Sequence, residues 1–346
     1  MRFLFTIFLL SISLFASQSK VTYIGNPYQN IYKSGEHIYS RNIWDMQLYN
    51  GKIYIGAGNS SNIGPSINSG RVSVFSLNPI TDKISFEYKV AEEQVNIFKV
   101  YDDILYIPGH DSTQKWEYGN FYTKYNGTWK KYRTIPNALH VYDLVKKDRT
   151  IYVALGLNHS GAIAVSKDNG YNWEIIKTKN GRVYSLFILN NKIYIDKQIS
   201  KKNKTTRIKK IKNKILYISA KKHNDHQSLP NKLFIAKEIN NKIISINIKL
   251  PTNNIPRDIL VRNDNIFILT SKTIKNKTEI KVLKYRYNIF NKYKEIISFK
   301  YDTFARSFEE VNGNFYFGMG CEIKNPNKWS LKELNQSCGN ILKVRG

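Results

Sequence analysis

Short runs of alternating apolar and polar residues recur along the chain, and most are joined in pairs by two-residue turns. The repeated unit is an apolar run, a turn of Asn, Gly or Asp, and a second run with Ile or Leu beside Tyr or Phe. Such turns are typical of β-hairpins, because they need positive φ angles. Six clear copies lie at residues 43–56, 96–109, 141–156, 183–195, 257–269 and 306–320, and a weaker seventh lies at 207–219.

The spacing of these hairpins predicts a β-propeller. Aligned on their turns, successive copies begin 42 to 52 residues apart, except for one interval of 23 residues. Repeats of this length with about four short strands are typical of propeller blades. We expect an all-β, six-bladed propeller in a single domain over residues 20–346, with the short interval as an extra hairpin in a long fourth blade. Seven blades, one of them degraded, is the alternative.

The first residues have the layout of a secretory signal peptide. Arg2 is followed by an apolar run of 14 residues, and small residues follow at Ala16, Ser17 and Ser19. The run is too short to cross a bilayer comfortably. We expect residues 1–19 to be removed and the mature protein to be secreted or periplasmic, soluble, not transmembrane, and monomeric. A buried N-terminal strand or helix is the alternative.

The charge of the chain has a different meaning in an exported protein. Lys plus Arg number 54 against 26 Asp plus Glu, for a formal net charge of +28. An exported protein rarely meets nucleic acid, so we expect a glycan or an anionic envelope component as partner instead. Residues 192–300 carry +20 of the charge and contain neither Gly nor Trp. We interpret them as a loosely constrained sector, with a dedicated anion-binding surface as the alternative.

Cysteine and histidine usage argues against a metal site. Cys321 and Cys338 are the two cysteines, and they enclose 16 residues. In an oxidising compartment we expect them to form a disulfide. Two cysteines exclude a four-cysteine zinc site, and no closely spaced histidine pair is specific for a metal. We therefore expect no metal and no cofactor.

One short motif carries a family resemblance. Residues 166–173 read SKDNGYNW and fit the pattern S-x-D-x-G-x-x-W, formed by Ser166, Asp168, Gly170 and Trp173. Asp168 can accept backbone N–H groups across the turn, Gly170 permits positive φ, and Trp173 can pack between blades. The motif resembles the Asp-box of sialidase-like secreted propellers. The resemblance implies a propeller with this motif on the face opposite the catalytic centre.

The hairpin alignment also defines a column of residues at the start of the inner strands: Trp44, Asn96, Tyr142, Tyr184, Arg207, Arg257 and Arg306. Sialidase-like enzymes use an arginine triad at the channel mouth. The resemblance makes Arg257 and Arg306, with Arg182 two positions from the column, candidates to grip an anion. Asp143, Arg257 and Arg306 are the catalytic candidates, but no Tyr–Glu nucleophile pair can be placed. Alternatively, the arginines pair with Asp45, Asp143 and Asp258.

Loops predicted on the face of the channel entrance hold aromatic and polar residues. The candidate ligand-binding residues are His110, Asp111, Trp116, Glu117, His140, His159 and Arg182. Flat aromatic faces beside Asp, Asn and His are common on sugar-binding surfaces; alternatively, Trp116 only packs its loop onto the blade. We expect a non-catalytic binding module for a glycan or another surface ligand. A glycoside hydrolase or lyase, and a periplasmic scaffold, are the alternatives.

Overall fold

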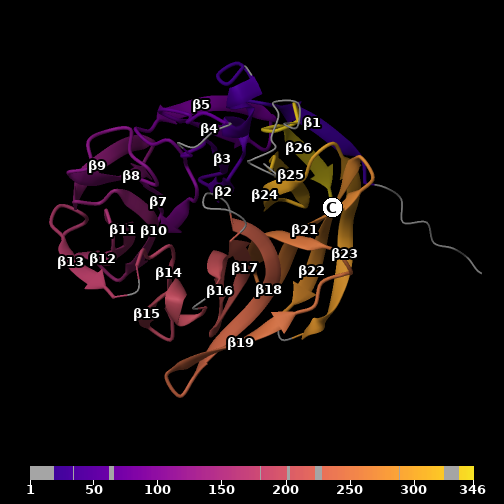
Figure 1. The fold of residues 1–346 in the computed structure, drawn as a ribbon. Coiled ribbons are helices and arrows are strands. Elements are labelled where there is room, and N and C mark those ends of the chain that lie inside the picture. The colour runs from indigo at the N-terminus through magenta and orange to yellow at the C-terminus, as the bar shows by residue number, and fades with distance from the viewer. Residues whose placement is uncertain are drawn as a thin grey trace, which may run out of the picture.

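The chain forms a six-bladed β-propeller, which confirms the predicted fold class. The computed structural model describes residues 19–33, 35–61, 66–179, 181–200, 203–222, 228–287, 289–322 and 335–346. Six four-stranded antiparallel sheets surround a central channel (Figure 1). The predicted signal peptide lies outside the described residues except for Ser19.

The first three blades follow one another along the chain. Blade 1 is β2 (Asp45–Tyr49), β3 (Lys52–Gly56), β4 (Ser73–Asn78) and β5 (Lys83–Lys89). Blade 2 is β6 (Lys99–Tyr101), β7 (Ile104–Pro108), β8 (Tyr118–Tyr125) and β9 (Thr128–Pro136). Blade 3 is β10 (His140–Lys147), β11 (Thr150–Gly156), β12 (Gly161–Ser166) and β13 (Glu174–Thr178).

Blades 4 and 5 have longer strands, and blade 6 combines strands from both ends of the chain. Blade 4 is β16 (Lys204–Ile211), β17 (Lys214–Lys222), β18 (Ser228–Ile239) and β19 (Lys242–Ile248). Blade 5 is β20 (Ile255–Arg262), β21 (Asn265–Ile274), β22 (Lys277–Arg286) and β23 (Ile289–Tyr301). Blade 6 is β24 (Ala305–Val311), β25 (Asn314–Met319), β26 (Ile341–Arg345) and β1 (Val21–Gly25). Two short 3-10 helices lie at Gly35–Arg41 and Asp196–Gln198.

The seven predicted hairpins are the first two strands of the six blades and one additional pair. Their turns have positive φ as predicted, for example 45° at Asn50 and 71° at Gly51. The additional pair, β14 (Leu186–Leu189) and β15 (Lys192–Ile195), differs from the prediction. It forms its own two-stranded sheet between blades 3 and 4 rather than part of a long fourth blade. Its two four-residue strands pair with each other and with no strand of a blade in the described residues.

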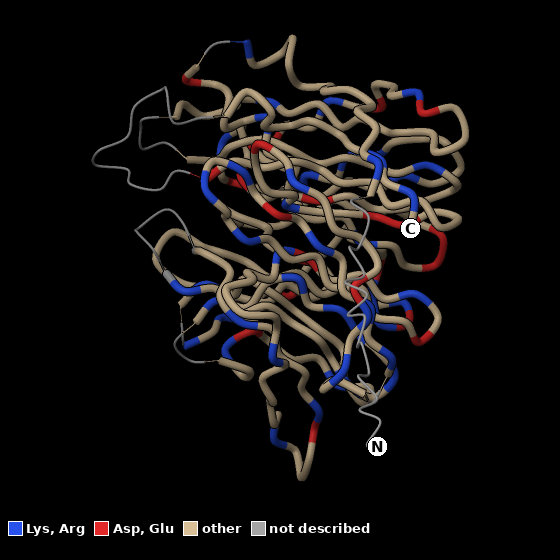
Figure 2. The backbone as a smooth tube through the Cα atoms, turned by 90° about the vertical axis from the view of Figure 1, so that its right-hand side faces the viewer, with Lys and Arg blue, Asp and Glu red and all other residues tan. Residues whose placement is uncertain are grey.

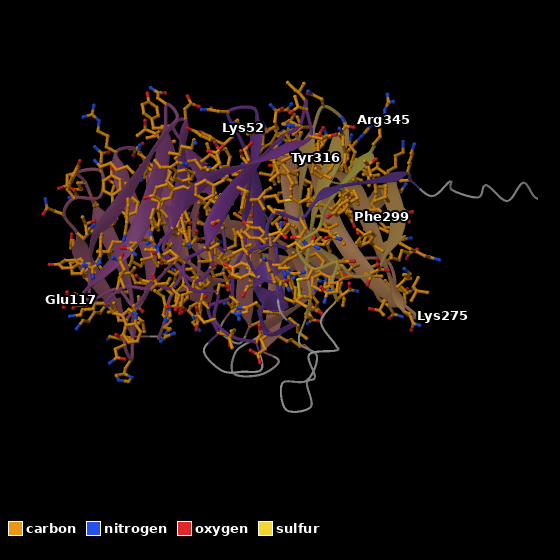
Figure 3. The ribbon with its side chains drawn as sticks, turned by 90° about the horizontal axis from the view of Figure 1, so that it is seen from above. Lys52, Glu117, Lys275, Phe299, Tyr316 and Arg345 are labelled. Carbon is orange, nitrogen blue, oxygen red and sulfur yellow. A yellow bond between two sulfur atoms is a disulfide. The ribbon has the colours of Figure 1, made fainter. Side chains whose placement is uncertain are left out.

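The first strand of each blade lines the channel, and the fourth lies at the rim (Figure 1). We call the end at which the first strands begin the mouth. Figure 3 gives an edge-on view, in which Lys52, at the start of β3 away from the mouth, and Glu117, in a loop at the mouth end, lie toward opposite faces. Loops that join second to third strands and fourth to first strands therefore meet at the mouth.

Apolar contacts between neighbouring blades hold the ring together. Phe121 and Ile135 of blade 2, for example, pack in one buried cluster with Leu144 and Val153 of blade 3. Removing such side chains from water is the main favourable term in folding. The ring closes because β1, from the start of the chain, pairs with the last strand, β26. With the ring closed, each blade packs between two neighbours, and its first strand is held at the channel.

Candidate active site at the channel mouth

The first strands of four blades contain one extra residue where they enter the channel. It is Tyr142 in blade 3, Arg257 in blade 5 and Arg306 in blade 6, and in blade 4 it falls between Thr206 and Lys209, at Arg207. A β-bulge of this kind changes the direction of the side chain relative to regular alternation. All four belong to the column predicted from the hairpin alignment, and Trp44 holds the same place immediately before β2. The bulges therefore bring predicted column residues to the mouth.

The residue after the column position joins neighbouring segments of the ring. Three buried aspartates accept a backbone N–H group from the segment that comes next around the ring: Asp45 from Phe98 (2.7 Å), Asp143 from Leu186 (3.0 Å) and Asp258 from Phe308 (3.2 Å). After Arg306 this residue is Ser307, whose Oγ donates to the Ile43 carbonyl at 3.0 Å. Within the described residues, Arg182, Arg257 and Arg306 contact other groups, so their alternative pairing with these aspartates is not observed. Asp45 and Asp258 pair instead with Arg207, and Asp143 pairs with Lys99.

Asp143, a predicted catalytic candidate, belongs to this joint between blades. Besides Leu186, it pairs with Lys99 at 2.9 Å, and the two side chains are 5% and 15% exposed. Its other backbone contact is the N–H of Leu144, at 2.8 Å. These contacts hold the carboxylate of Asp143 between β6, β10 and β14.

Arg257 is buried near the mouth, close to Arg306. Its Nε donates to Ser271 Oγ at 2.7 Å, and its guanidinium pairs with the carboxylate of Glu322. The same guanidinium lies over the ring of Phe304, 3.9 Å from the centroid. Arg257 is thus a paired, buried cation.

Arg306 neighbours Arg257 but makes neutral contacts. It donates to Asn42 Oδ1 and to the carbonyl of Cys321, each at 2.9 Å. Its guanidinium lies 4.1 Å from the centroid of the Trp44 ring. Burial lowers the pKa of Arg306 to about 10. The group remains charged at neutral pH and is held mostly by dipoles and aromatic faces.

Arg207, a further column residue, crosses the channel. Its φ is +56°, within a register shift of β16. The guanidinium reaches Asp45 of blade 1 at 3.0 Å and Asp258 of blade 5 at 3.5 Å. A positive φ is uncommon for a residue with a side chain. Here it directs an arginine to link three blades.

A second group gathers four predicted ligand-binding residues, His110, Asp111, His140 and Arg182. The His140 Nδ1 atom lies 3.1 Å from the carbonyl oxygen of His110 and 3.5 Å from Asp111. Arg182 Nη1 donates to the hydroxyl of Tyr142 at 3.0 Å. The side chains of these four residues and of Tyr142 are partly exposed. We call these residues, together with Tyr184 and Lys204, the mouth cluster.

Aromatic contacts order the mouth cluster. The Tyr142 ring stacks on His140 with centroids 5.1 Å apart and lies 4.8 Å from the ring of Tyr184. Lys204 Nζ lies 4.5 Å from the centroid of Tyr184. The cluster therefore combines two imidazoles, two phenols and two cations.

The hydrogen bonds assign a proton to each imidazole. A carbonyl oxygen only accepts, so His140 Nδ1 carries the proton that it donates to His110 O, and its Nε2 is left as an acceptor. Asn96 Nδ2 lies 3.3 Å from His110 Nδ1, which makes that nitrogen the acceptor and Nε2 the protonated atom. Burial, with the nearby Arg182, lowers the pKa of His140 to about 4. Both rings are neutral near pH 7, because burial also lowers the pKa of His110.

Carboxyl groups beside the cluster are protonated more readily than usual. Burial, with Glu93 and Glu92 nearby, raises the pKa of Asp111 to about 8. Burial raises the pKa of Glu92 to about 7. The 3.5 Å approach of Asp111 to His140 is therefore a contact between two neutral groups near pH 7, rather than an ion pair.

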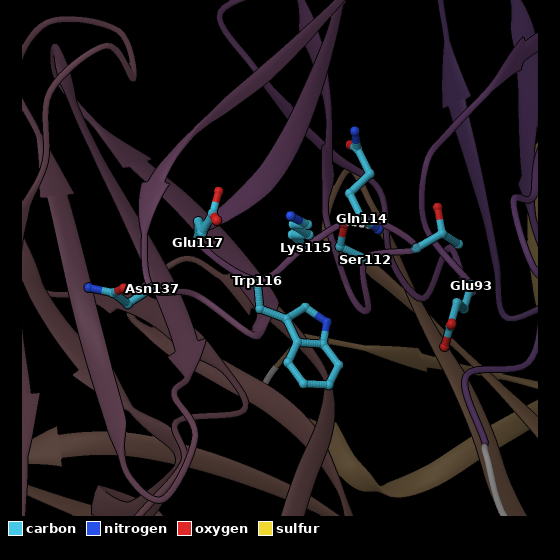
Figure 4. A pocket seen from close by; sticks show the side chains of 8 residues that line it. Glu93, Ser112, Gln114, Lys115, Trp116, Glu117 and Asn137 are labelled. Carbon is cyan, nitrogen blue, oxygen red and sulfur yellow. Dashed lines mark hydrogen bonds between the residues drawn. The ribbon is translucent and has the colours of Figure 1, made fainter.

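Trp116 and Glu117 line an open pocket whose wall includes Ser112, the residue after Asp111 of the mouth cluster. The pocket has a volume of about 660 Å³ and is lined by Glu93, Ser112, Thr113, Gln114, Lys115, Trp116, Glu117 and Asn137. The Trp116 indole lies in the open between Glu93 and Asn137 (Figure 4). Trp116 is 58% exposed, so it does not simply pack its loop onto the blade. Asp111 joins this pocket to the mouth cluster, since its carbonyl accepts the Glu93 N–H at 2.8 Å.

His159 is not brought to the mouth cluster. It is exposed in the turn between β11 and β12, and among the described residues no hydrogen bond, ion pair or ring contact joins it to the cluster. Tyr142 and Tyr184 were in the predicted column but were not selected as ligand-binding residues. Lys204 carries no sequence signal, because it is one of 27 Lys and Arg residues between 192 and 300.

The turn between β12 and β13 has the contacts predicted for its motif. Asp168 Oδ1 accepts the Asn172 N–H at 2.9 Å, and Gly170 has a φ of +89°. These hydrogen bonds lower the pKa of Asp168 to about 2. Trp173 meets the Phe121 ring of blade 2 edge-on, with centroids 5.8 Å apart. Because β12 runs away from the mouth, the turn lies at the opposite end of the blade.

The two cysteines are bonded to each other. Cys321 and Cys338 form the predicted disulfide. Across the described ranges, no group of three or more His, Cys, Asp or Glu side chains is arranged to hold a metal ion. No helix within those ranges has the length and apolar character needed to cross a bilayer.

Comparisons with known proteins give a fold and no family. No family model and no curated protein matches the sequence. The structure is similar to an α-L-arabinanase of Penicillium chrysogenum solved with arabinobiose, with a TM-score of 0.50 and 10% identity over 94% of this chain and 97% of that one. An ulvan lyase bound to -[GlcA(1-4)Rha3S]- gives 0.48 and 11%, over 95% of both chains. An α-L-arabinofuranosidase of Fusarium graminearum with arabinobiose gives 0.44 and 9%, over 88% and 92%.

These values define a distant structural resemblance to carbohydrate-active propeller enzymes. Identities near 10% show the fold alone, and the two TM-scores below 0.5 carry no argument about the site. One fold hosts many functions, so function must be argued from the residues at the mouth.

Proposed function

We propose that the protein binds an acidic glycan at the channel mouth, with the mouth cluster as the anchoring site. The observation that carries the proposal is the convergence of Tyr142, Arg182 and Tyr184 with two neutral histidines, His110 after β7 and His140 at the start of β10. A guanidinium recognises carboxylate and sulfate groups through paired hydrogen bonds. Phenol and imidazole groups supply partners for sugar hydroxyls.

Arg182 is the residue best placed to receive the acid. Its described hydrogen bond goes to a neutral phenol, and no described carboxylate forms an ion pair with it. Arg257, in contrast, is paired with Glu322 and buried. Arg182 therefore retains unused N–H donors at a partly exposed position, which favours an anionic ligand.

The open pocket at Trp116 extends this site. An exposed indole offers a flat apolar face to a sugar ring, while Glu117 and Asn137 offer acceptors and donors for hydroxyls. Because the pocket continues from Asp111, a chain anchored at Arg182 can run outward over Trp116. The disulfide supports export to an oxidising compartment, which we propose together with removal of residues 1–19 and a monomeric single-domain state.

Calorimetric titration with glycans tests the proposal. Oligosaccharides with carboxylate or sulfate groups are compared with neutral arabinan and xylan oligosaccharides at low and moderate salt. We expect the acidic ligands to bind more tightly, with an affinity that falls as salt rises. Arg182→Ala should weaken their binding by about tenfold or more, equivalent to about 1.4 kcal/mol.

Arg345→Ala is the matched control. Arg345 is an exposed arginine at the other end of the channel (Figure 3), so its loss changes the net charge equally without touching the mouth. Equal weakening by both variants would mean that binding follows net charge alone. That result, or equal affinity for neutral and acidic glycans, would contradict the proposal.

A further inference from the structure

The mouth cluster contains the groups that a proton abstraction beside a carboxylate requires. His140 has its Nδ1 proton committed to the carbonyl of His110, so the lone pair of its neutral ring lies on Nε2. No described residue hydrogen-bonds to this Nε2 atom. A neutral imidazole with a fixed tautomer and an open nitrogen is suited to act as a general base.

The phenol of Tyr142 lies beside this base. The two rings stack with an interplanar angle of 20° and centroids 5.1 Å apart. Arg182 donates to the Tyr142 oxygen, which leaves the phenol proton directed elsewhere. Burial raises the pKa of Tyr142 above its ordinary value, so the phenol keeps its proton at neutral pH. Tyr142 can therefore act as a general acid.

Two cations stand close to the base and the acid. Arg182 contacts Tyr142 directly, and Lys204 lies over the ring of Tyr184, which in turn contacts Tyr142. The charge of a substrate carboxylate resists loss of the proton on the adjacent carbon. Cations that neutralise the carboxylate stabilise the carbanion that forms, which is electrostatic stabilisation of a transition state.

We propose that the mouth is the active site of a lyase that cleaves uronate-containing polysaccharides by β-elimination. The inference rests on the proposed binding of an acidic glycan at Arg182. His140 Nε2 takes the proton from C5 of the uronate, and the electron pair of that C–H bond forms the C4–C5 double bond. The bond from C4 to the glycosidic oxygen breaks, and the Tyr142 hydroxyl gives its proton to that oxygen.

The step is balanced without water, metal or oxidant. One product ends in a 4,5-unsaturated uronate, and the other recovers a free hydroxyl group. Proton exchange through solvent then returns His140 and Tyr142 to their starting states. Hydrolysis would instead need a pair of carboxyl groups acting across the bond. Glu92 is committed to Asn120 and Tyr122, at 2.6 and 2.9 Å, and is therefore not a second group for Asp111.

The experiment measures unsaturated product directly. The full protein is incubated with polygalacturonate, alginate and hyaluronan, with neutral arabinan as a control, and the ultraviolet absorbance of the conjugated product is followed. Mass spectrometry of the oligomers should show fragments one water lighter than hydrolysis fragments. We expect wild-type protein to form this product from at least one of the three uronate polymers, and none from arabinan.

Variants assign the roles. Tyr142→Phe keeps the ring that stacks on His140 and removes the acid, and His140→Gln removes the base. We expect each to lower kcat by about 100-fold or more, the usual contribution of a general acid or base. The affinity of Tyr142→Phe for a uronate oligomer should fall far less than its kcat, because Arg182 rather than the phenol anchors the carboxylate. Tyr125→Phe is the control, since Tyr125 is an exposed tyrosine in the turn from β8 to β9.

The outcomes separate this inference from the proposed function. Binding of uronate oligomers through Arg182 without unsaturated product from any polymer would overturn the lyase and leave the binding site standing. Saturated, hydrolytic fragments would also overturn it. Absence of all binding would overturn both. Full activity in Tyr142→Phe and His140→Gln would show that elimination takes place elsewhere.

Discussion

Asp111 and Glu92 hold protons near neutral pH because they are buried beside one another. Their pKa values, about 8 and about 7, are those of groups that lose more by desolvation than they gain from partners. Glu92 also has an Oε2 atom that is buried without a hydrogen-bond partner among the described residues. No sequence pattern indicates these raised pKa values, because they depend on how closely Glu92, Glu93 and Asp111 approach one another in the fold.

The raised pKa of Asp111 should make stability depend on pH. Above about pH 4 the unfolded chain releases this proton while the native protein keeps it until about pH 8. Stability from this group is therefore full at low pH and falls as pH rises through that window, by up to about 1.4 kcal/mol per unit. Asp111→Asn should remove the fall.

Urea unfolding at several pH values measures this effect. We expect the variant to gain stability relative to wild type as pH rises from about 4 to about 8. The opposite trend from His140, whose pKa is lowered, cancels in the comparison. Glu117→Gln, exposed in the same loop, controls for removal of a charge. Parallel curves for wild type and Asp111→Asn would count against the assignment.

Ser166 carries a second prediction at the residue scale. Its buried Oγ accepts the Gly170 N–H at 2.8 Å and donates to Asp168 at 2.8 Å. Ser166→Ala leaves the Gly170 donor without its partner, so we expect a loss of about 1–2 kcal/mol in the free energy of unfolding. Denaturant titration measures it, with exposed Lys167→Ala as the neighbouring control. A loss no larger than that of the control would contradict the role of the hydroxyl.

At the scale of elements, hairpins were predictable and bulges were not. The Asn, Asp and Gly turns specify each hairpin locally, because their residues tolerate positive φ. The bulges at Tyr142, Arg257 and Arg306 leave no comparable local signal, since a single extra residue changes neither turn nor hydrophobicity. The column alignment therefore found these positions, but it could not show that the residues after them, Asp143, Asp258 and Ser307, bond to the next segment of the ring.

The joint at Asp143 gives a prediction for one such element. Asp143→Ala removes the partner of the Leu186 N–H and of Lys99, both in the blade junction. Breaking a buried ion pair by removing one member costs about 3–5 kcal/mol. We expect a stability loss of that order, measured by urea unfolding, with glycan affinity of the folded protein retained.

A double variant separates the lost joint from a lost catalytic group. In Asp143→Asn combined with Lys99→Met, no unpaired charge remains in the junction. We therefore expect it to recover part of the stability lost in Asp143→Ala. Equal loss in both would show that the ion pair is not the cause. A selective loss of ligand binding or turnover without loss of stability would instead assign Asp143 a role in the site at the mouth.

At the scale of the whole molecule, β1 closes the ring. Val21, Thr22 and Tyr23 pair with Val344, Lys343 and Leu342 of β26. Removing residues 19–25 exposes the edge of β26, and an unpaired edge is a template for association. We expect a lower thermal midpoint and concentration-dependent aggregation, measured by calorimetry and light scattering. A matched protein lacking residues 1–18 alone should remain monodisperse, and equal behaviour of the two would contradict the role of β1.

The positive charge is uneven along the chain, with +20 of the +28 in residues 192–300. Lys and Arg outnumber Asp and Glu over the backbone (Figure 2). Several cations of the basic sector have local partners, such as Lys212 with Asp264 at 2.9 Å and Lys281 with Glu295 at 2.9 Å. Lys204 is the member of this sector that reaches the mouth cluster.

The bulge and the aspartate that follows it have a consequence for how this scaffold can change. Adjacent positions in one strand divide two tasks: Asp143 and Asp258 fasten the neighbouring blade, while Tyr142 and Arg257 face the mouth. The mouth position is Trp44, Tyr142, Arg257 or Arg306 in four of the blades. In each case the next residue hydrogen-bonds to the neighbouring segment of the ring. Under the proposed binding function, substitutions at these positions would change ligand preference blade by blade while the joints keep the ring closed. Such positions would then form a set for combinatorial libraries aimed at new glycans.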